Sequence, residues 1–382
     1  MSVWDEVVGQ EHAVETFRSA VADPRAMTHA WLVTGPPGSG RSTAARAFAA
    51  ALQCPDGGCG FCHACSSVLA GTHPDVTLVA TERLTIGIEE TRALVSLAQR
   101  SPSQGRWRVI VVEDADRMAE RTSNVLLKAI EEPPARTVWL LCAPSPQDVV
   151  VTIRSRSRAV GLRVPPPEAV AELLVTRDGI APEVAAVAAR AAQSHIGVAR
   201  RLARDPEARE RRDKVLAIPA SIRGVGDAIL AAGELVEVAQ AVAKAATADR
   251  DAAERAELMR SLGAEGETRL PPALRAQLTQ LEKDQKRRAT RAQRDVLDRA
   301  MVDLLSLFRD VLVVQLGAQL DAMNLEHREI VAVLAAAATP EQTLRRMDAI
   351  GLARTRLEGN VSPLLAVEAM TLAFRPQARQ LG

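Results

Sequence analysis

Residues 29–42 read HAWLVTGPPGSGRS. The first six residues predict a short apolar strand, and the residues from Ser42 to Ala51 predict an alanine-rich helix. Residues 35–42 match the pattern G-x-x-x-x-G-K-[S/T], in which backbone N–H groups hold phosphates, the lysine reaches the outer phosphates and the hydroxyl holds Mg²⁺. An ordinary turn between a strand and a helix is the alternative. The expected nucleotide-binding residues of this loop are Gly35, Pro36, Gly38, Ser39, Gly40, Arg41 and Ser42.

One position of this phosphate loop departs from the pattern. Arg41 stands where the pattern has lysine. Arginine presents a large planar fork rather than a compact point charge, so the replacement is not conservative. We therefore expect the architecture of a nucleotide-binding ATPase that lacks one of its working parts. Whether the loop holds ATP and Mg²⁺ stays open on the sequence alone.

Strands and helices alternate through the first part of the chain. Apolar runs at 76–79, 108–112 and 137–142 predict buried strands, and helical patterns at 88–100 and 125–131 separate them. This alternation is typical of a parallel α/β sheet covered on both faces. After the three prolines at 165–167 only helical patterns follow.

The same pass along the chain predicts three domains. We expect an α/β nucleotide-binding-like domain at 1–163, a small helical domain at 164–206 and an all-helical domain at 207–382. A charged stretch around 241–294, broken by Gly263 and Pro271-Pro272, is either a lengthened helix pair or a loosely ordered insertion.

Composition excludes several classes of protein. The chain has 382 residues and a net charge of +1, so no overall field draws it to nucleic acid or to an anionic membrane. Its apolar stretches are too short to span a bilayer, and its N-terminus lacks the apolar core of a signal peptide. Four of its five cysteines lie between positions 54 and 65, which in an intracellular chain favours metal over disulfides. We expect a cytoplasmic protein with no membrane partner.

The cysteine cluster predicts a metal site. Cys54, Cys59, Cys62 and Cys65 follow the spacing C-x4-C-x2-C-x2-C, with three glycines that allow tight turns. Four thiolates suit tetrahedral Zn²⁺ with no open position, which makes the site structural. Three alternatives stay open: an iron–sulfur cluster, although a further cysteine of the ferredoxin pattern is missing, His63 as a ligand in place of one cysteine, and unligated thiols.

An acidic pair follows the strand at 108–112. In phosphate-loop ATPases an acid at this strand end holds Mg²⁺, and a neighbouring polar group orients the attacking water. Here the pair reads Glu113-Asp114, and the shorter aspartate in the second position reaches less far toward that water. Solvated acids that cap the next helix are the alternative interpretation.

Arginines recur at every second position from 154 to 158. We expect an extended segment that carries Arg154, Arg156 and Arg158 on one side. Two roles fit this spacing. The arginines either form a charged edge that blocks strand pairing, or they present a guanidinium to a phosphate on another subunit, a contribution of roughly 10³–10⁵ in rate.

Taken together, these residues resemble the subunits of the bacterial DNA polymerase III clamp loader, an AAA+ assembly, and most of all its delta-prime type. The resemblance rests on VGQ at 8–10, the phosphate loop, the cysteine module, whose first gap is shorter than usual, and NVLLKAIEEPP at 124–134. Ser155-Arg156-Ser157 stands where the family has Ser-Arg-Cys, and residues 197–200 resemble its second-sensor motif, which ends at Arg200. The matches cover roughly the first 205 residues, and the helical remainder fits only in type, as a collar domain.

The resemblance implies a role as well as a fold. It implies an AAA+ domain, a helical lid domain and an all-α collar domain, with structural Zn²⁺ on the four cysteines. In the ATP-hydrolysing subunits the loop has lysine and the acids read Asp-Glu, and this chain departs at both places while it keeps Arg156. That combination implies a delta-prime subunit with a degenerate ATP site, whose Arg156 acts in trans on ATP held by a neighbouring subunit.

The partners implied are the gamma/tau and delta subunits and, through the complex, the sliding clamp and primed DNA in replication. Nucleotidyltransferase activity would then belong to the polymerase complex and not to this chain. Two other functions are weighed against this one. The first is an ATP-hydrolysing motor subunit of the gamma/tau kind, in which Arg41 replaces lysine. The second is a zinc protein that reads DNA directly, which the lack of Lys and Arg in the cysteine module disfavours.

Overall fold

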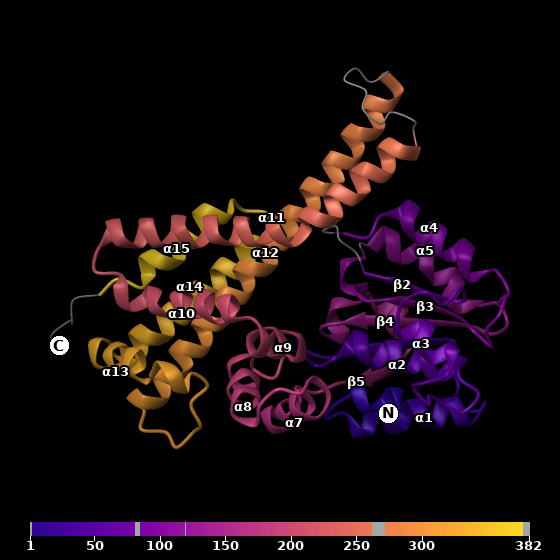
Figure 1. Ribbon diagram of the computed structural model, residues 1–382, viewed down its shortest axis with the longest axis horizontal. Coiled ribbons are helices and arrows are strands. Elements are labelled where there is room, and N and C mark those ends of the chain that lie inside the picture. Colours follow the sequence, from indigo (N-terminus) through magenta and orange to yellow (C-terminus); the bar gives the residue numbers. More distant parts are fainter. Residues whose placement is uncertain (1, 81–84, 119, 262–271, 377–382) are drawn as a thin grey trace. The chain divides into compact units, whose positions relative to one another are not determined.

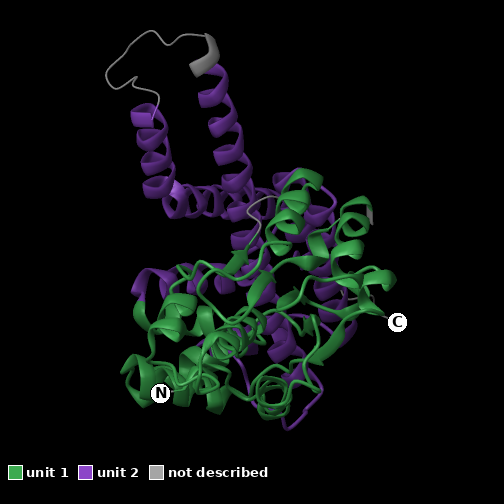
Figure 2. Ribbon diagram, turned by 90° about the vertical axis from the view of Figure 1, so that its right-hand side faces the viewer, with its two compact units in different colours: residues 1–204 green, residues 205–382 purple. Residues whose placement is uncertain are grey.

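The computed structural model describes residues 2–80, 85–118, 120–261 and 272–376. The chain divides into two compact units, residues 1–204 and residues 205–382 (Figure 2). The first unit contains the strands, whereas the described residues of the second unit form helices and connecting loops and no strand.

Five parallel strands form the sheet of the first unit (Figure 1). In chain order they are β1 (Ala30–Thr34), β2 (Val76–Val79), β3 (Arg108–Val112), β4 (Thr137–Ala143) and β5 (Arg158–Gly161). Their order across the sheet is β2-β3-β4-β1-β5, so β1 lies between β4 and β5. Because all pairings are parallel, the loops that follow β1, β3 and β4 leave the same edge of the sheet.

Helices cover both faces of this sheet, as its apolar strands require. On β1, Trp31 and Val33 face one core, with α1 (Glu11–Ala22) and α2 (Arg41–Gln53), whereas Ala30 and Leu32 face the other. The second core is completed by α4 (Ile88–Ala98) and α5 (Glu120–Glu131). Small alanine side chains bury most of α2 against the sheet, and the ring of Phe48 lies 5.1 Å from that of Trp31. This close packing fixes the direction in which α2 leaves the phosphate loop.

The remaining elements of the first unit are short. A 3-10 turn, η1 (Val3–Glu6), opens the unit, and α3 (His63–Leu69) follows the cysteine cluster. After β5 come α7 (Pro167–Asp178), α8 (Pro182–Ala191) and α9 (Ile196–Arg204), which pack on one another. We call these three helices the lid.

The structure corrects one sequence prediction around β5. The segment that the arginine spacing predicts to be extended begins as a helical turn, α6 (Val151–Arg154), and only Arg158 enters the strand. Hydrogen bonds from the backbone N–H groups of Ile153, Arg154 and Ser155 to the carbonyls of residues 150 and 151 hold the turn. The strand itself is absent from the prediction because only Val160 of its four residues is buried, which leaves no apolar run.

The second unit is a helical bundle with a long helical pair. Its helices are α10 (Pro206–Ser221), α11 (Val225–Ser261), α12 (Pro272–Gln315), α13 (Arg328–Ala337), α14 (Pro340–Glu358) and α15 (Pro363–Ala373). The core contains the rings of Phe308 and Phe374, which are tilted by 55° and have centroids 5.2 Å apart. Parts of α11 and α12 continue beyond this core as an antiparallel pair (Figures 1 and 2). The predicted breakers Gly263 and Pro271 lie outside the described residues.

A buried polar network also holds the bundle together. The guanidinium of Arg212 donates to Asp303 at 3.3 Å and to the side chain of Asn324, while the backbone N–H of Asn324 donates to Asp310 at 2.8 Å. Since these groups are nearly inaccessible to water, each depends on the others for its hydrogen bonds. Among the helices that the structure describes, none is both long and apolar enough to cross a lipid bilayer.

Candidate nucleotide site, trans arginine and metal centre

The phosphate loop has the backbone conformation that its glycines allow. Gly38 and Gly40 have φ angles of 88° and 86°, values that favour glycine, and Gly40 is the N-cap of α2. The loop therefore leads from the end of β1 into a helix N-terminus, as an anion-binding loop does. Its cation, however, points back at the loop: the guanidinium of Arg41 donates a hydrogen bond to the carbonyl of Gly35.

The acid at the end of β3 is also engaged within the protein. Arg46, in the second turn of α2, donates from Nη2 and Nε to one carboxylate oxygen of Glu113, at 2.8 Å and 3.0 Å. The side chain of Glu113 is only 14% exposed, so the pair is partly shielded from water. Asp114 lies 3.7 Å from Arg117. With Arg41 and Glu113 both paired inside the protein, the residues in this arrangement do not fit Mg²⁺ and ATP.

Gln10 ties the phosphate loop to the start of the lid. Its side-chain amide donates to the carbonyls of Ser39, at 3.2 Å, and Arg163, at 2.6 Å, and it accepts from the N–H of Arg163. Gly38 lies directly against the lid, because a Cβ added to it would be 2.9 Å from the Cα of His195, just before α9. There is no room for even one extra carbon atom between the loop and the lid here.

Arg200, the expected second-sensor residue, faces a carboxylate of the lid. Its Nε donates to Asp178 at 2.6 Å, and Arg204 holds the other oxygen of Asp178 at 2.9 Å. Asp178 is the last residue of α7 and its side chain is 8% exposed. The structure thus connects Arg200 with α7.

The three arginines after β4 point to three different places. Arg154 donates to the carbonyl of Pro146, and Arg158 donates to the carbonyl of Ala26 with its guanidinium 5.0 Å from the ring of Trp31. These two arginines therefore brace the local structure.

Arg156 differs from its two neighbours because its guanidinium pairs with a carboxylate, whereas Arg158 is equally exposed but donates to a backbone carbonyl. Its Nε is 2.5 Å from a carboxylate oxygen of Glu131, and its side chain is 40% accessible to solvent. Glu131 is the last residue of α5, within the stretch 124–134 on which the family resemblance rests. The ion pair holds the guanidinium at the surface, and since exposed pairs are weak, it can be exchanged for another anion.

The four clustered cysteines are brought together by the fold. Their sulfur atoms all lie within 4.8 Å of one another, and Cys54 Sγ is 3.6 Å from Cys59 Sγ and 3.7 Å from Cys62 Sγ. Ligands about 2.3 Å from a tetrahedral ion stand about 3.8 Å apart, so these residues fit Zn²⁺. Cys54, despite the short first gap, is part of the cluster, whereas His63 is exposed and outside it.

Backbone groups prepare this cluster for a cation. Burial opposes ionisation of Cys54, but hydrogen bonds from the N–H groups of Cys59, Gly58 and Asp56 outweigh it and lower its pKa to about 6. The cluster is also tied to the N-terminus: Trp4 Nε1 donates to the carbonyl of Gly57 at 3.1 Å, and the N–H of Val3 donates to that of Gly58. Metal bound here would therefore fix η1 as well as the loop.

Three contacts around the phosphate loop were not predicted from the sequence. Arg46 is the partner of Glu113, Gln10 joins the loop to the lid, and His195 packs on Gly38. A signal for Arg46 was present, because a lone arginine in an otherwise alanine-rich helix with a buried face needs a nearby anion. Gln10 belongs to the VGQ at 8–10, but that pattern does not predict its contacts, and no local pattern marks His195; the contacts of both residues join positions far apart in the sequence.

Comparison with known proteins agrees with this geometry. Residues 9–166 match the family described as "DNA polymerase III, delta subunit". The gamma/tau subunit of DNA polymerase III from Mycobacterium bovis is 34% identical over 174 residues, which is 44% of this chain and 30% of the relative. The delta' subunit from Pseudomonas aeruginosa is 37% identical over 134 residues, 34% of this chain and 41% of the relative. The chain thus spans less than half the length of these curated relatives.

A solved structure gives a weaker likeness. The gamma-subunit-related protein of DNA polymerase III from Thermotoga maritima aligns over 95% of this chain and 98% of its own, at 15% identity and a TM-score of 0.43.

The first unit defines the class: a parallel α/β domain with a phosphate loop and the three lid helices, followed by a large helical part. The fold class predicted from the sequence is therefore confirmed. Residues 9–166 are similar to the family of DNA polymerase III delta subunits, and this part of the chain also resembles gamma/tau and delta' subunits of DNA polymerase III.

Proposed function

We propose that this chain is a delta-prime-type subunit of the clamp loader, which supports ATP-dependent placement of the sliding clamp on primed DNA. In this role it does not hydrolyse ATP itself. It supplies Arg156 to ATP held by a neighbouring motor subunit of the gamma/tau kind, and a delta-type subunit completes the assembly. The complex acts in the cytoplasm.

The ion pair between Arg46 and Glu113 carries this proposal. A carboxylate that must hold Mg²⁺ is neutralised at 2.8 Å by an arginine of the same domain. To bind the metal, the acid would have to give up a partly shielded, two-donor contact, which costs free energy. Two further contacts also disfavour nucleotide: Arg41 turns toward Gly35, which leaves the loop without a cation for the phosphates, and the lid packs on Gly38, which leaves no space beside that glycine.

Arg156 supports the second half of the proposal. Its side chain is exposed, and its partner Glu131 lies on a different element. Its Nη1 also donates to the carbonyl of Thr152 at 3.0 Å and to the hydroxyl of Ser155 at 3.2 Å, which fixes the guanidinium at the surface of its own turn. A planar fork suits a phosphate that carries developing negative charge. We propose that a γ-phosphate of the neighbour takes the place of Glu131.

The cysteine cluster and the second unit fit the same role. Zn²⁺ on the four sulfur atoms would be structural, because no ligand position would remain open. The second unit exposes large apolar side chains where α11 and α15 pack together, and apolar surface of this kind suits association with other subunits. These side chains are Val225, Ile229, Leu230, Leu364 and Leu365.

The test is an Arg156→Ala change in the reconstituted loader, with DNA-stimulated ATP turnover as the readout. We expect turnover at the interface served by this subunit to fall by about 10³-fold or more, which removes that site's share of the steady-state rate. Arg156→Lys should be almost as impaired, because lysine keeps the charge but loses the fork. Glu131→Gln should retain turnover, since it removes only the resting partner.

The matched control is Arg92→Ala, an exposed arginine of the same unit that pairs with Glu89 on α4. This control should leave turnover unchanged. Equal rates in the Arg156→Ala and wild-type complexes, with the subunit fully incorporated, would refute the role in trans.

A motor subunit with its own ATPase is the second candidate, supported by the glycine-shaped loop and by Ser42 at the start of α2. Turnover by the isolated protein that disappears in Ser42→Ala would favour it over the delta-prime role.

A further inference from the structure

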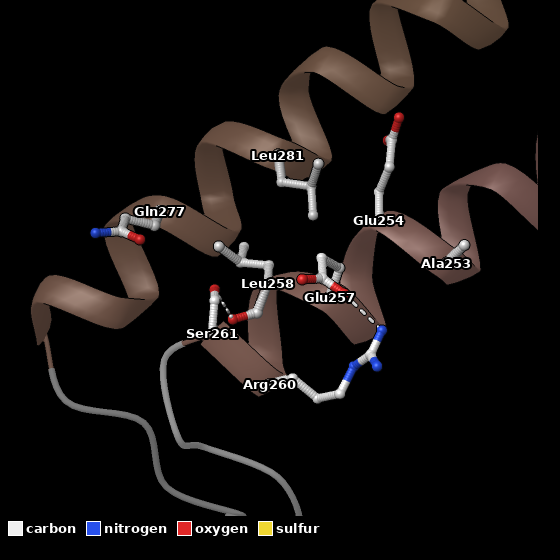
Figure 3. Close-up of a pocket in the computed structure, with 8 residues that line it drawn as sticks. All are labelled: Ala253, Glu254, Glu257, Leu258, Arg260, Ser261, Gln277 and Leu281. Atoms are coloured by element: carbon white, nitrogen blue, oxygen red, sulfur yellow. Dashed lines mark hydrogen bonds and ion pairs between the residues drawn. The ribbon is translucent and has the colours of Figure 1, made fainter. Parts of the chain in front are cut away.

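The charged stretch of the second unit forms an arm. We define the arm as residues 241–261 of α11 and 272–294 of α12, which run antiparallel (Figure 1). Ion pairs join the two helices: Arg288 donates to both oxygens of Glu254, at 2.6 Å and 2.9 Å, and Arg255 contacts Glu282 at 2.9 Å. A pocket of ≈ 660 Å³ lies between them, where Leu258 and Leu281 point toward one another (Figure 3).

Cations gather on the other side of α12. Residues 283–294 contain six basic residues and one acidic residue, Asp284, in a chain whose net charge is only +1. Arg288 is directed to α11, and the remaining five fall on one side of a helix with about 3.6 residues per turn. We call these five the basic stripe: Lys283, Lys286, Arg287, Arg291 and Arg294.

Local anions neutralise only part of the basic stripe. Lys283 and Lys286 are exposed and have no ion pair among the described residues. Arg287 meets Asp284 at 3.4 Å in an exposed pair, which contributes little. Arg291, whose side chain is only 18% exposed, meets Asp295 at 3.7 Å, and Arg294 donates to the side chain of Asn360 at 2.8 Å. Apart from the adjacent Lys286 and Arg287, successive cations stand about 4.5–6 Å apart along the axis, so they can contact several anionic groups in a row.

The side chains of the arm favour a partner that presents a row of phosphate groups. Among the arm residues whose side chains are described, 241–261 and 275–294, none is a large exposed apolar residue. A protein partner is usually anchored by buried apolar or aromatic groups, which this surface does not offer. The sequence 241–294 also contains no aromatic residue or histidine, so single-stranded bases find nothing on which to stack.

We propose that the basic stripe binds the phosphate backbone of double-helical nucleic acid without regard to sequence. This goes beyond the proposed function and does not depend on it. Each cation that contacts a phosphate releases a counterion, so the observed affinity should fall steeply with salt.

The experiment measures binding of the full-length chain to a fluorescent 30-base-pair DNA duplex by anisotropy, over a series of salt concentrations. We compare wild type with the triple variant Lys283→Gln, Lys286→Gln and Arg287→Gln. The triple variant should bind on the order of 10²-fold more weakly at 0.1 M salt. Its slope of log affinity against log salt should be about 2.7 smaller in magnitude, which is 0.9 for each lost contact. A single strand of equal length should bind more weakly than the duplex.

The matched control removes the same charge elsewhere in the second unit, with Arg223→Gln, Arg328→Gln and Arg345→Gln, all exposed in the structure. It should retain the wild-type slope, and circular dichroism should show that both triple variants fold. Equal losses of DNA affinity in the two triple variants overturn the proposal, because they would reflect net charge alone. Failure of the wild type to bind duplex at about 50 mM salt, or preferential binding of polyglutamate, also overturns it and assigns the stripe to an acidic protein.

Discussion

At the C-terminal end of α2 four sulfur atoms converge within 4.8 Å, whereas at its N-terminal end the polar groups of the phosphate loop face their own protein. Both regions were recognised from sequence patterns of similar strength. In the cysteine cluster, backbone N–H groups already favour a thiolate at Cys54. In the phosphate loop, Arg41 and Glu113 are each satisfied by a neighbour that no pattern includes.

The difference between the cysteine cluster and the phosphate loop shows what a ligand-binding motif does not specify. Glycines fix the path of a backbone, and both regions have that path. Binding further requires that the ligand-contacting atoms stay free, and one arginine in the next turn, Arg46, is enough to remove this freedom from Glu113. A cluster of four thiols has no competing cation, so its atoms remain available.

The largest effect should come from removing a ligand of the cysteine cluster. Zinc stabilises small modules by about 10–16 kcal/mol, so Cys65→Ala should lose the metal and much of the stability of the first unit. Zinc content by elemental mass spectrometry and the melting temperature by circular dichroism measure both losses. We expect one zinc per chain in the wild type and none in the variant.

Cys142→Ala is the matched control, because Cys142 is equally inaccessible but lies at the end of β4, outside the cluster. It should keep one zinc per chain. A Cys65→Ala protein that retains the metal, or a wild type that never contains it, would remove the contrast between the two ends of α2.

A smaller effect on stability should come from Asp75, which holds the loop before β3 without any metal. This inaccessible carboxylate accepts hydrogen bonds from the N–H groups of residues 103–105 and contacts Arg108 at 2.9 Å. Burial opposes its ionisation, but the hydrogen bonds from Gly105, Ser103 and Gln104 outweigh burial and lower its pKa to about 2, from 3.8.

Because the folded pKa lies below the unfolded one, Asp75 stabilises the protein above about pH 4 and loses that contribution as the pH falls toward 2. The shift corresponds to about 2 kcal/mol. Denaturant unfolding of wild type and Asp75→Asn should therefore differ most at pH 7 and converge near pH 2. The exposed Asp148→Asn serves as control and should differ little from wild type at either pH. If the difference in unfolding free energy between wild type and Asp75→Asn does not depend on pH, the carboxylate charge is not what stabilises the loop.

Sequence reasoning succeeded where the signal is local. The strands at 76–79 and 108–112 agree with β2 and β3 at both ends, since buried strands give continuous apolar runs. It failed at β5, where a strand with three exposed residues gives no run, and at 151–154, where spacing alone predicted an extended chain.

The candidate sites show the same division. Ligand atoms close together in the chain, such as the four sulfurs, were predictable because the spacing itself limits their separation. Partners that come from other elements were not: Glu113 meets Arg46 across 67 positions, and Gln10 meets Arg163 across 153. Such contacts depend on sheet order, and in this sheet β4 lies between β1 and β3.

The smallest expected effect is a gain in nucleotide affinity, and it directly tests the phosphate loop at the N-terminal end of α2. The double variant Arg41→Lys and Arg46→Ala restores the compact cation of the loop and frees Glu113 for Mg²⁺. If these two arginines are what closes the site, the isolated variant should bind a fluorescent ATP analogue about tenfold more tightly than wild type, a difference of about 1.4 kcal/mol. The gain should require Mg²⁺, because the freed carboxylate acts through the metal.

Arg106→Lys with Arg92→Ala is the control, since it makes the same two replacements at exposed positions of the same unit. It should bind the analogue as the wild type does. If the wild type already binds as tightly as the double variant, the ion pair between Arg46 and Glu113 yields readily to nucleotide. The two ends of α2 would then both be working sites, and the motor function would be the better account of this chain. If instead only the double variant gains affinity for the analogue, the two ends of α2 differ in kind. One end then carries a structural metal site, and the other carries a nucleotide site that its own side chains block.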